Sequence, residues 1–118
     1  MRAIRGAITV EEDKEDEVLQ ASEEILKEII NENDLQLEEF VSVTFTATAD
    51  IKSVYPAVAA RKLGLDNVPL LCFQEMKVEN SLRKCIRIMV YINRDCKLDD
   101  IKHVYLRKAV NLRPDLNN

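Results

Sequence analysis

Apolar and polar residues alternate over residues 41–48, where the sequence reads VSVTFTAT. One set of positions is apolar, and the other carries hydroxyl groups. A period of two is typical of a strand with one buried face, so this stretch predicts a half-buried antiparallel strand. Short apolar stretches predict further strands at residues 2–8, 69–75 and 84–93.

Two helices are predicted between these strands. The first follows an acidic run at residues 11–17, which we interpret as a solvated helix start, because negative charge suits the positive end of the helix dipole. Its cap is expected to be Thr9 with Glu12, or Asp13 alone. Its buried face is expected to consist of the apolar residues that recur at helical spacing, which are Val18, Leu19, Ile25, Leu26, Ile29 and Ile30.

The second predicted helix spans residues 53–63, with Pro56 in its first turn and Gly64 at its C-terminal cap. A helical turn is expected at residues 98–102, followed by short extended pieces at 103–105 and 109–112.

The order of these elements favours an α+β fold, in which two main helices lie on one face of a mixed β-sheet. The chain has no internal repeat and few glycines or prolines, so we interpret residues 1–118 as a single domain. Residues 113–118 are expected to form a mobile C-terminal tail.

The predicted strand at residues 84–93 is apolar on both faces. One face consists of isoleucines and a valine and is expected to lie under the helices. The other holds a charged residue, Arg87, between Cys85 and Met89. Two helices cannot cover both faces of a sheet, so we expect another subunit to cover the second face, which predicts a closed oligomer.

The charge balance and hydropathy narrow the possible partners. The formal net charge is -4 and the pI is about 5.1, which disfavours a general role at nucleic acids or membrane surfaces. The chain has no apolar run of membrane-spanning length and no signal-peptide pattern at its N-terminus, so a cytosolic location is expected.

The cysteines and the single histidine argue against metal, redox and covalent chemistry. Cys72, Cys85 and Cys96 cannot all pair, and their spacing fits neither a CxxC motif nor a zinc site. A Cys72 nucleophile with His103 as its base is a covalent alternative, which the absence of basic residues around Cys72 disfavours. No cofactor signature accompanies these residues, so none is expected.

Charged or hydroxyl-bearing residues interrupt several apolar stretches, where a charge is costly unless it is paired. Alternation places Cys72 and Glu75 on opposite faces, so the strand at residues 69–75 must end or bulge if both residues line one site. The set as a whole suits a small polyanion, because it offers three arginines, a carboxylate and a phenol: Arg5, Arg87, Arg113, Glu75 and Tyr105.

Each of these residues also has a purely structural interpretation. Arg87 can form an ion pair with Glu75 across the sheet, and Arg5 can be the charge of an edge strand. Tyr105 can be a core aromatic residue with a satisfied hydroxyl group. Arg113 can be an exposed charge in the tail.

Six strings, in this order, resemble the monofunctional chorismate mutases of the trimeric, mixed α/β (Bacillus-type, AroH-like) family, as distinct from the all-helical type. They are IRGA (4–7), TADIKSVYPA (48–57), VPLLCFQEM (68–76), KCIRIM (84–89), HVYL (103–106) and LRPDL (112–116). No single string is specific, but the combination is, and it covers nearly the whole chain.

The resemblance implies a cofactor-free isomerase of the shikimate pathway, which serves phenylalanine and tyrosine biosynthesis. The family converts chorismate to prephenate by an intramolecular [3,3] Claisen rearrangement. Its active sites lie in clefts between the subunits of a homotrimer, which forms a pseudo-barrel. The implied partners are therefore chorismate, prephenate and further copies of the chain. No nucleic acid or membrane is expected as a partner.

By matching motif positions, the resemblance implies that Arg5 and Arg87 bind the substrate carboxylates and that Arg87 also reaches the ether oxygen. Glu75 would accept a hydrogen bond from the ring hydroxyl, Tyr105 would bind a carboxylate, and Cys72 would supply a polar contact. Four further residues would admit and enclose the anion or line its apolar wall: Arg61, Arg113, Tyr55 and Ala57.

The chain departs from the family pattern at three positions. Tyr55 replaces a frequent phenylalanine, Leu71 a threonine and Val58 a lysine, and the missing lysine is expected to weaken anion capture. Two other functions stay open: a non-catalytic trimeric metabolite-binding module and a trimeric imine deaminase of similar architecture. Retention of both Arg87 and Glu75 disfavours the first, because a binder of a dianion needs arginines more than a carboxylate.

Overall fold

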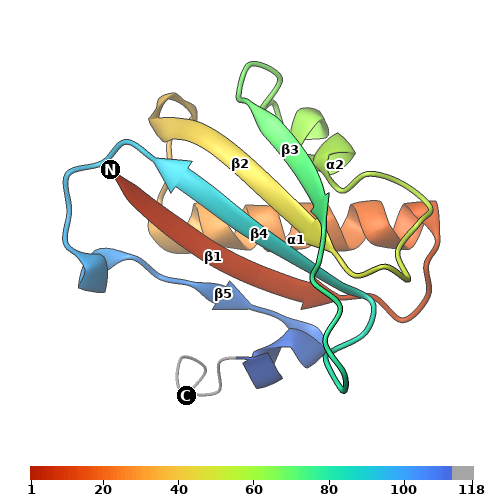
Figure 1. Cartoon of the computed structure of the whole chain (residues 1–118). Helices are drawn as coiled ribbons and strands as arrows, with labels where there is room; N and C mark the ends of the chain where they lie inside the picture. Colours follow the sequence, from red (N-terminus) through yellow and green to blue (C-terminus); the bar gives the residue numbers. More distant parts are fainter. Residues whose placement is uncertain (113–118) are drawn as a thin grey trace.

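The computed structural model describes residues 1–112, in which five strands form one mixed sheet (Figure 1). The strands are β1 (Arg2–Thr9), β2 (Phe40–Ala47), β3 (Leu70–Gln74), β4 (Cys85–Ile92) and β5 (Val104–Tyr105). They lie in the order β3-β2-β4-β1-β5. The central β4 is antiparallel to β1 and β2, whereas β2 with β3 and β1 with β5 are parallel. The predicted strands are confirmed, although β2 is antiparallel only towards β4.

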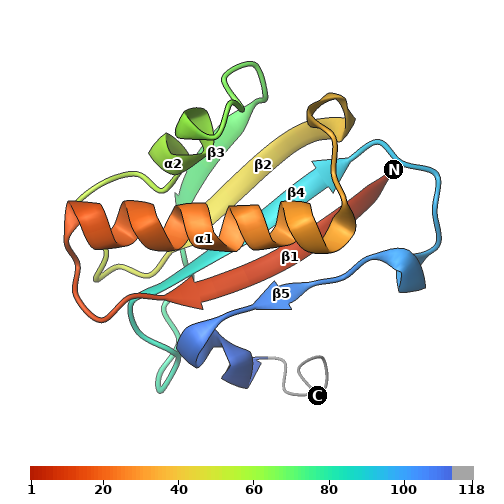
Figure 2. The same ribbon diagram turned by 180° about the vertical axis from the view of Figure 1, so that it is seen from behind.

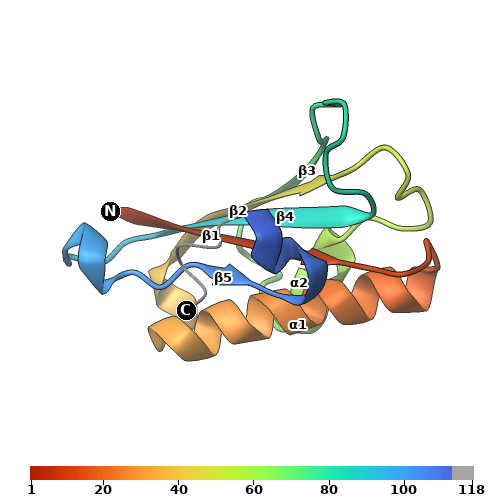
Figure 3. The same ribbon diagram turned by 90° about the horizontal axis from the view of Figure 1, so that it is seen from below.

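Both α-helices lie on the same face of the sheet, as the sequence predicts (Figures 2 and 3). The long helix α1 (Glu15–Asn33) crosses that face, and the short helix α2 (Ala57–Lys62) lies near β2 and β3. Within residues 1–112, no helix combines the length and the hydropathy of a membrane span.

The start of α1 differs from the prediction. Its N-cap is Lys14, which forms no side-chain capping hydrogen bond. Asp13 instead accepts hydrogen bonds from the backbone N–H groups of Lys52, at 2.8 Å, and Ser53, at 3.1 Å. These bonds join residues 52–53 to the start of α1, and α2 begins only at Ala57 rather than at residue 53. The C-terminal cap of α2 agrees with expectation, because Gly64 has a φ of +92°.

The C-terminal region is more helical than predicted. The 3₁₀ helix η2 (Leu98–Asp100) and strand β5 match the expected turn and extended piece, but residues 109–112 belong to a second 3₁₀ helix, η3 (Arg107–Leu112). Arg107 has a φ of 55° and donates from Nη1 to the carbonyl of Thr9 at 3.0 Å. Lys108 N–H donates to the Thr9 hydroxyl oxygen at 3.2 Å. These contacts tie η3 to the end of β1, so Thr9 does not cap α1.

The two faces of the sheet differ in burial. On the face under the helices, the side chains of β1, β2 and β4 form the main core together with α1, and the largest include Ile4, Ile8, Phe45, Ile86 and Ile92. The opposite face carries Leu71, Phe73 and Tyr91, which are 60%, 54% and 38% exposed. The two α-helices leave this second face of β4 open, as the sequence predicts, although Cys85 is buried there in a small cluster with Ala109 of η3.

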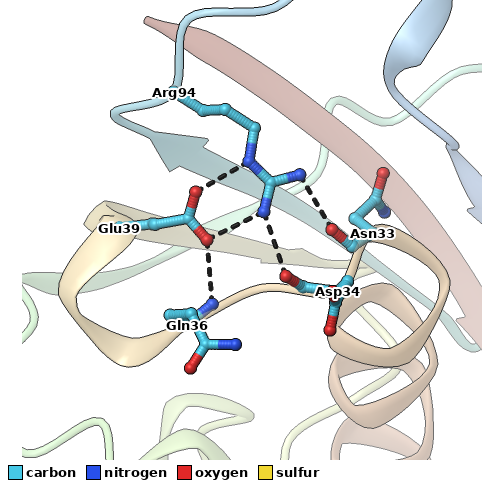
Figure 4. A network of polar contacts seen from close by, with 5 residues as sticks. All are labelled: Asn33, Asp34, Gln36, Glu39 and Arg94. Atoms are coloured by element: carbon cyan, nitrogen blue, oxygen red, sulfur yellow. Dashed lines mark hydrogen bonds and ion pairs between the residues drawn. The ribbon is translucent and has the colours of Figure 1, made fainter.

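Arg94, which follows β4, joins the end of α1 to the start of β2 (Figure 4). Its guanidinium donates two hydrogen bonds to the Glu39 carboxylate, at 2.7 and 2.8 Å, and one each to the carbonyls of Asn33 and Asp34. Glu39 ends the 3₁₀ helix η1 (Leu37–Glu39) and also accepts from the Gln36 N–H. The Arg94 side chain and this N–H hold the pKa of Glu39 down to about 2.

Candidate active site

A row of side chains crosses the sheet on the face away from the helices. Strand pairing places Phe73 of β3 beside Thr46 of β2, and Thr46 opposite Arg87 of β4. Arg87 in turn lies opposite Ala7 of β1, which pairs with Tyr105 of β5. Residues paired in this way share a face and lie within side-chain reach. Ala7, which is fully buried, therefore lies between Arg87 and Tyr105 in this row.

Glu75 joins this row from the end of β3. The strand ends at Gln74, and the Glu75 N–H donates to the carbonyl of Ala47 at 2.8 Å. Its carboxylate oxygen Oε2 accepts a 2.6 Å hydrogen bond from the hydroxyl of Thr46 and lies 3.3 Å from Nε of Arg87. The ion pair that the sequence offered as a structural alternative is thus present. The distance between Nε of Arg87 and Oε2 of Glu75 is that of an ion pair, but Nε does not donate a hydrogen bond to this oxygen.

Two buried polar atoms in this region have no hydrogen-bond partner among residues 1–112, namely Nε of Arg87 and the hydroxyl of Tyr105. Tyr105 belongs to a small apolar cluster on this face, together with Ala7, Cys85 and Ala109. Burial raises the pKa of the Cys85 thiol to about 11, so the thiol is neutral beside Arg87. A buried donor without a partner costs free energy, so both atoms are suited to a ligand that supplies oxygen atoms.

Arg5 lies on the same face of β1 as Ala7 and pairs with Met89. Its side chain is half-buried, and its backbone N–H donates to Nδ1 of His103 at 3.0 Å. We call Arg5, Glu75, Arg87 and Tyr105 the arginine–glutamate group. All four were predicted from the sequence.

A second set of predicted residues lies around β3 and α2. Cys72 pairs with Phe45, which belongs to the main core, so the two share the face under the helices. Burial raises the pKa of the Cys72 thiol, while the backbone of Ala57 and the charge of Arg61 act in the opposite direction. Tyr55 is 73% exposed, and Arg61 is also exposed. We call Tyr55, Ala57, Arg61 and Cys72 the α2-edge group.

A surface pocket of about 610 Å³ adjoins the α2-edge group. Its wall includes Tyr55, Cys72 and Phe73, together with the connection from β2 to α2. The end of β3 therefore separates two environments. Glu75 reaches the open face of the sheet, whereas Cys72 contacts the helix-covered side. Within one chain the predicted residues form two groups rather than one site, and Arg113 lies outside the described residues.

The covalent alternative receives no support from this geometry. Cys72 lies on β3 at one edge of the sheet, and His103 directly precedes β5 at the other edge (Figure 1). The raised pKa of Cys72 also disfavours its thiolate form. These two residues of one chain do not form a nucleophile and base pair.

A family model described as chorismate mutase type I matches residues 1–116. The chain belongs to this family. The chorismate mutase AroH of Bacillus subtilis (strain 168) is 48% identical over 118 residues, covering 99% of this chain and 93% of that protein. The chorismate mutase AroH of Thermus thermophilus is 47% identical, covering 100% of this chain and 98% of that protein.

A solved chorismate mutase from Clostridium thermocellum has the same fold. Its TM-score is 0.90 at 42% identity, and the match covers 92% of this chain and 97% of that one. The present protein is therefore itself a chorismate mutase, an isomerase, and it is built on a mixed five-stranded sheet with two helices. The comparisons favour this activity over the metabolite-binding and imine deaminase alternatives.

Two polar residues beside the predicted groups were not identified as candidates from the sequence. Thr46 contacts Glu75, and Asp50 accepts hydrogen bonds from the Thr48 hydroxyl and the Lys84 N–H. The hydroxyl groups of β2 were interpreted only as the polar face of a strand. The sequence held no signal that separated Thr46 from the other threonines, because its position opposite Arg87 follows from strand pairing.

Proposed function

We propose that this chorismate mutase is a cytosolic homotrimer with three equivalent clefts. In each cleft, the arginine–glutamate group of one subunit and the α2-edge group of its neighbour enclose one chorismate. The observation that supports this most directly is the separation of the two groups within a single chain. The first group supplies two cations, a carboxylate and a phenol. The second supplies an apolar wall and one further cation, Arg61.

The open face of the sheet supports the oligomer. Leu71, Phe73 and Tyr91 make this face apolar around the arginine–glutamate group, and such a face is normally covered. A ring of identical subunits joins two different surfaces of the chain at each interface, whereas a two-fold dimer joins a surface to itself. Two complementary groups on one chain therefore favour a ring, and the family resemblance favours a ring of three.

In the proposed mechanism, Arg5, Arg87 and Tyr105 bind the two carboxylates and hold the enolpyruvyl side chain over the ring. Orientation of this kind can lower a barrier by up to about 7–11 kcal/mol in the best intramolecular models. Glu75 accepts a hydrogen bond from the ring hydroxyl. No proton has to move, because the rearrangement breaks one C–O bond and forms one C–C bond within the same molecule.

Charge separates as the C–O bond stretches, with negative charge on the ether oxygen and positive charge on the ring. The Nε of Arg87 is a buried donor that has no hydrogen-bond partner in residues 1–112, and we assign it to this oxygen. A preorganised donor of this kind is worth about 3–4 kcal/mol in the transition state. The carboxylate of Glu75 lies on the side that would face the positive ring.

The assignment of residues is tested by chorismate turnover, with prephenate identified as the product. Arg87→Ala is expected to lose most of kcat while its oligomeric state, measured by light scattering, is unchanged. Near-wild-type turnover of this variant would contradict the assigned role of Arg87.

Subunit mixing tests the composition of the cleft. Arg87→Ala removes the key cation of one group, and the double variant Tyr55→Ala/Arg61→Ala damages the other. After joint refolding at equal amounts, about one quarter of the clefts in a random cyclic trimer combine two intact groups. The mixture should therefore show about one quarter of the wild-type activity. If each site were built within one chain, the mixture would be no more active than the average of the two variants.

A further inference from the structure

We propose that Thr46 is a positioning residue that holds Glu75 and Arg87 apart in the geometry needed for catalysis. This inference rests on the roles proposed above for those two residues. It assigns to the Thr46 hydroxyl the task of occupying one oxygen of the Glu75 carboxylate. The other oxygen, Oε1, is then presented to the ring hydroxyl of the substrate.

The contacts of Glu75 carry the first step. Its backbone is fixed by the hydrogen bond from its N–H to the carbonyl of Ala47, the residue that follows Thr46. Its side chain is fixed by the 2.6 Å hydrogen bond from the Thr46 hydroxyl to Oε2. Two neighbouring residues of β2 therefore fix both the backbone and the side chain of Glu75, although Glu75 itself lies just beyond the end of β3.

The second step concerns competition for Oε2. The Thr46 hydroxyl donates to this oxygen, and Nε of Arg87 lies 3.3 Å from it without hydrogen-bond geometry. Arginine and carboxylate groups tend to form two parallel hydrogen bonds when nothing prevents them. That arrangement would satisfy Nε with Glu75 and withdraw it from the substrate. Thr46 opposes this collapse because its hydroxyl takes one lone pair of that oxygen and fixes the orientation of the carboxylate.

The position of Thr46 in the sheet allows a clean test. Thr46 and Thr44 lie on the same face of β2, and each stands opposite a residue of β4. Thr46 stands opposite Arg87, whereas Thr44 stands opposite Met89 and beside Leu71. Thr46→Val keeps the branched shape and removes only the hydroxyl group, and Thr46→Ser keeps the hydroxyl group. Thr44→Val makes the same chemical change two residue pairs away on the same face of the strand.

Steady-state kinetics should separate these variants. Thr46→Val is expected to lower kcat about tenfold or more, the usual worth of a hydrogen bond to a charged group, with a smaller change in KM. Thr46→Ser should recover most of the lost kcat, and Thr44→Val should behave as wild type. In a Glu75→Ala background, which removes the acceptor, Thr46→Val should cost little more, because two residues that act through one contact are not additive.

The outcomes distinguish this inference from the proposed function. If Glu75→Gln and Arg87→Ala lose activity but Thr46→Val does not, the role of Thr46 is wrong and the proposed site stands. A full additional loss in the Glu75→Ala background would also overturn it. If Glu75→Gln and Arg87→Ala both keep wild-type turnover, the proposed site itself is wrong. Should Thr46→Val fail to fold, Thr46→Ala takes its place: activity equal to that of Thr46→Ser would overturn the role of the hydroxyl, and a loss in Thr46→Ala alone would support it.

Discussion

Nε of Arg87 lies 3.3 Å from Oε2 of Glu75 but donates no hydrogen bond to it. The pair is therefore held in an incomplete state, in which the charges compensate each other while a buried donor remains for another acceptor. This state is unfavourable in the free protein and favourable once a ligand oxygen arrives. It links the packing of the sheet directly to the proposed chemistry.

This relationship predicts that a lysine cannot replace Arg87. Arg87→Lys keeps the positive charge but loses the rigid fork that can bind a carboxylate and the ether oxygen together. We expect kcat to fall about a hundredfold, within the range for loss of one preorganised donor. Chorismate turnover measures the effect, and a lysine variant with more than about half of wild-type kcat would show that charge alone suffices.

Tyr105→Phe should separate stability from substrate binding. The Tyr105 hydroxyl is buried without a partner in the described part of the chain, so its removal should leave the free energy of unfolding unchanged or slightly higher. Substrate binding should weaken, and KM should rise about tenfold, because a hydrogen bond to a charged carboxylate is lost.

Urea denaturation at fixed protein concentration and steady-state kinetics provide the two readouts for Tyr105→Phe. A loss of stability above about 1 kcal/mol would mean that the hydroxyl has a partner in the free protein.

The ion pair between Glu39 and Arg94 predicts a defined acid sensitivity. The pKa of Glu39 is lowered from 4.5 to about 2, so the pair stabilises the folded chain fully above pH 4.5. That stabilisation is lost as the pH falls towards about 2, because the carboxyl group becomes protonated. The stability difference between wild type and Glu39→Gln should therefore shrink over this window.

Denaturation curves recorded at several pH values check this prediction, with Glu38→Gln as a control on the exposed neighbouring residue. A difference that stayed constant down to pH 2 would contradict the assigned role of the ion pair.

The two glycines should respond to alanine for different reasons. A Cβ on Gly6 would lie 2.8 Å from Cδ1 of Ile29 and 3.1 Å from the carbonyl oxygen of Val104, so Gly6→Ala should cost about 1–3 kcal/mol through overpacking. Gly64 has open space but a φ of +92°, so Gly64→Ala should cost about 1 kcal/mol through backbone strain.

Thermal denaturation of both glycine variants measures these costs. A compensating Ile29→Val change, which removes the crowding methyl group, should rescue part of the loss in Gly6→Ala and none of the loss in Gly64→Ala.

Asp50 should stabilise the start of β4. Its carboxylate accepts the N–H of Lys84 at 3.2 and 3.1 Å and the hydroxyl of Thr48. Lys84 has a φ of 47°, an unfavourable conformation that these bonds help to maintain. Asp50→Ala should lower the free energy of unfolding by about 1–3 kcal/mol, and Asp50→Asn by less, because an amide keeps one acceptor oxygen. Urea denaturation tests this, and equal losses in both variants would contradict a role as acceptor.

Much of the fold was determined by local patterns in the sequence. The alternation at residues 41–48 and the helical spacing from Val18 to Ile30 each reflect burial of one side of an element, so they predicted β2 and α1. The two apolar faces of β4 likewise predicted a sheet with one face open. These features depend on neighbouring residues in the chain, and that is why the sequence alone contains them.

The candidate site was predicted in its members but not in its arrangement. Arg5, Glu75, Arg87 and Tyr105 were named from charges in apolar stretches and from the family resemblance. Strand pairing brings the two arginines and Tyr105 to one face, and hydrogen bonds to β2 bring Glu75 there. Alternation along residues 69–75 already placed Cys72 and Glu75 on opposite faces, and the contacts of Glu75 with Thr46 and Arg87 confirm this division. Thr46 was missed because its hydroxyl gains significance only from its partner on another strand.

The sequence by itself indicated the family and the main elements, and it named the residues of the candidate site, whose roles stay predictions. Only the tertiary structure decided that Asp13 binds residues 52–53 instead of capping α1, that residues 109–112 form a 3₁₀ helix, and that Nε of Arg87 and the Tyr105 hydroxyl are buried without partners in residues 1–112. The physical reason is the same in each case. These contacts join segments far apart in the chain, and their geometry follows from strand order and register, which no local pattern encodes.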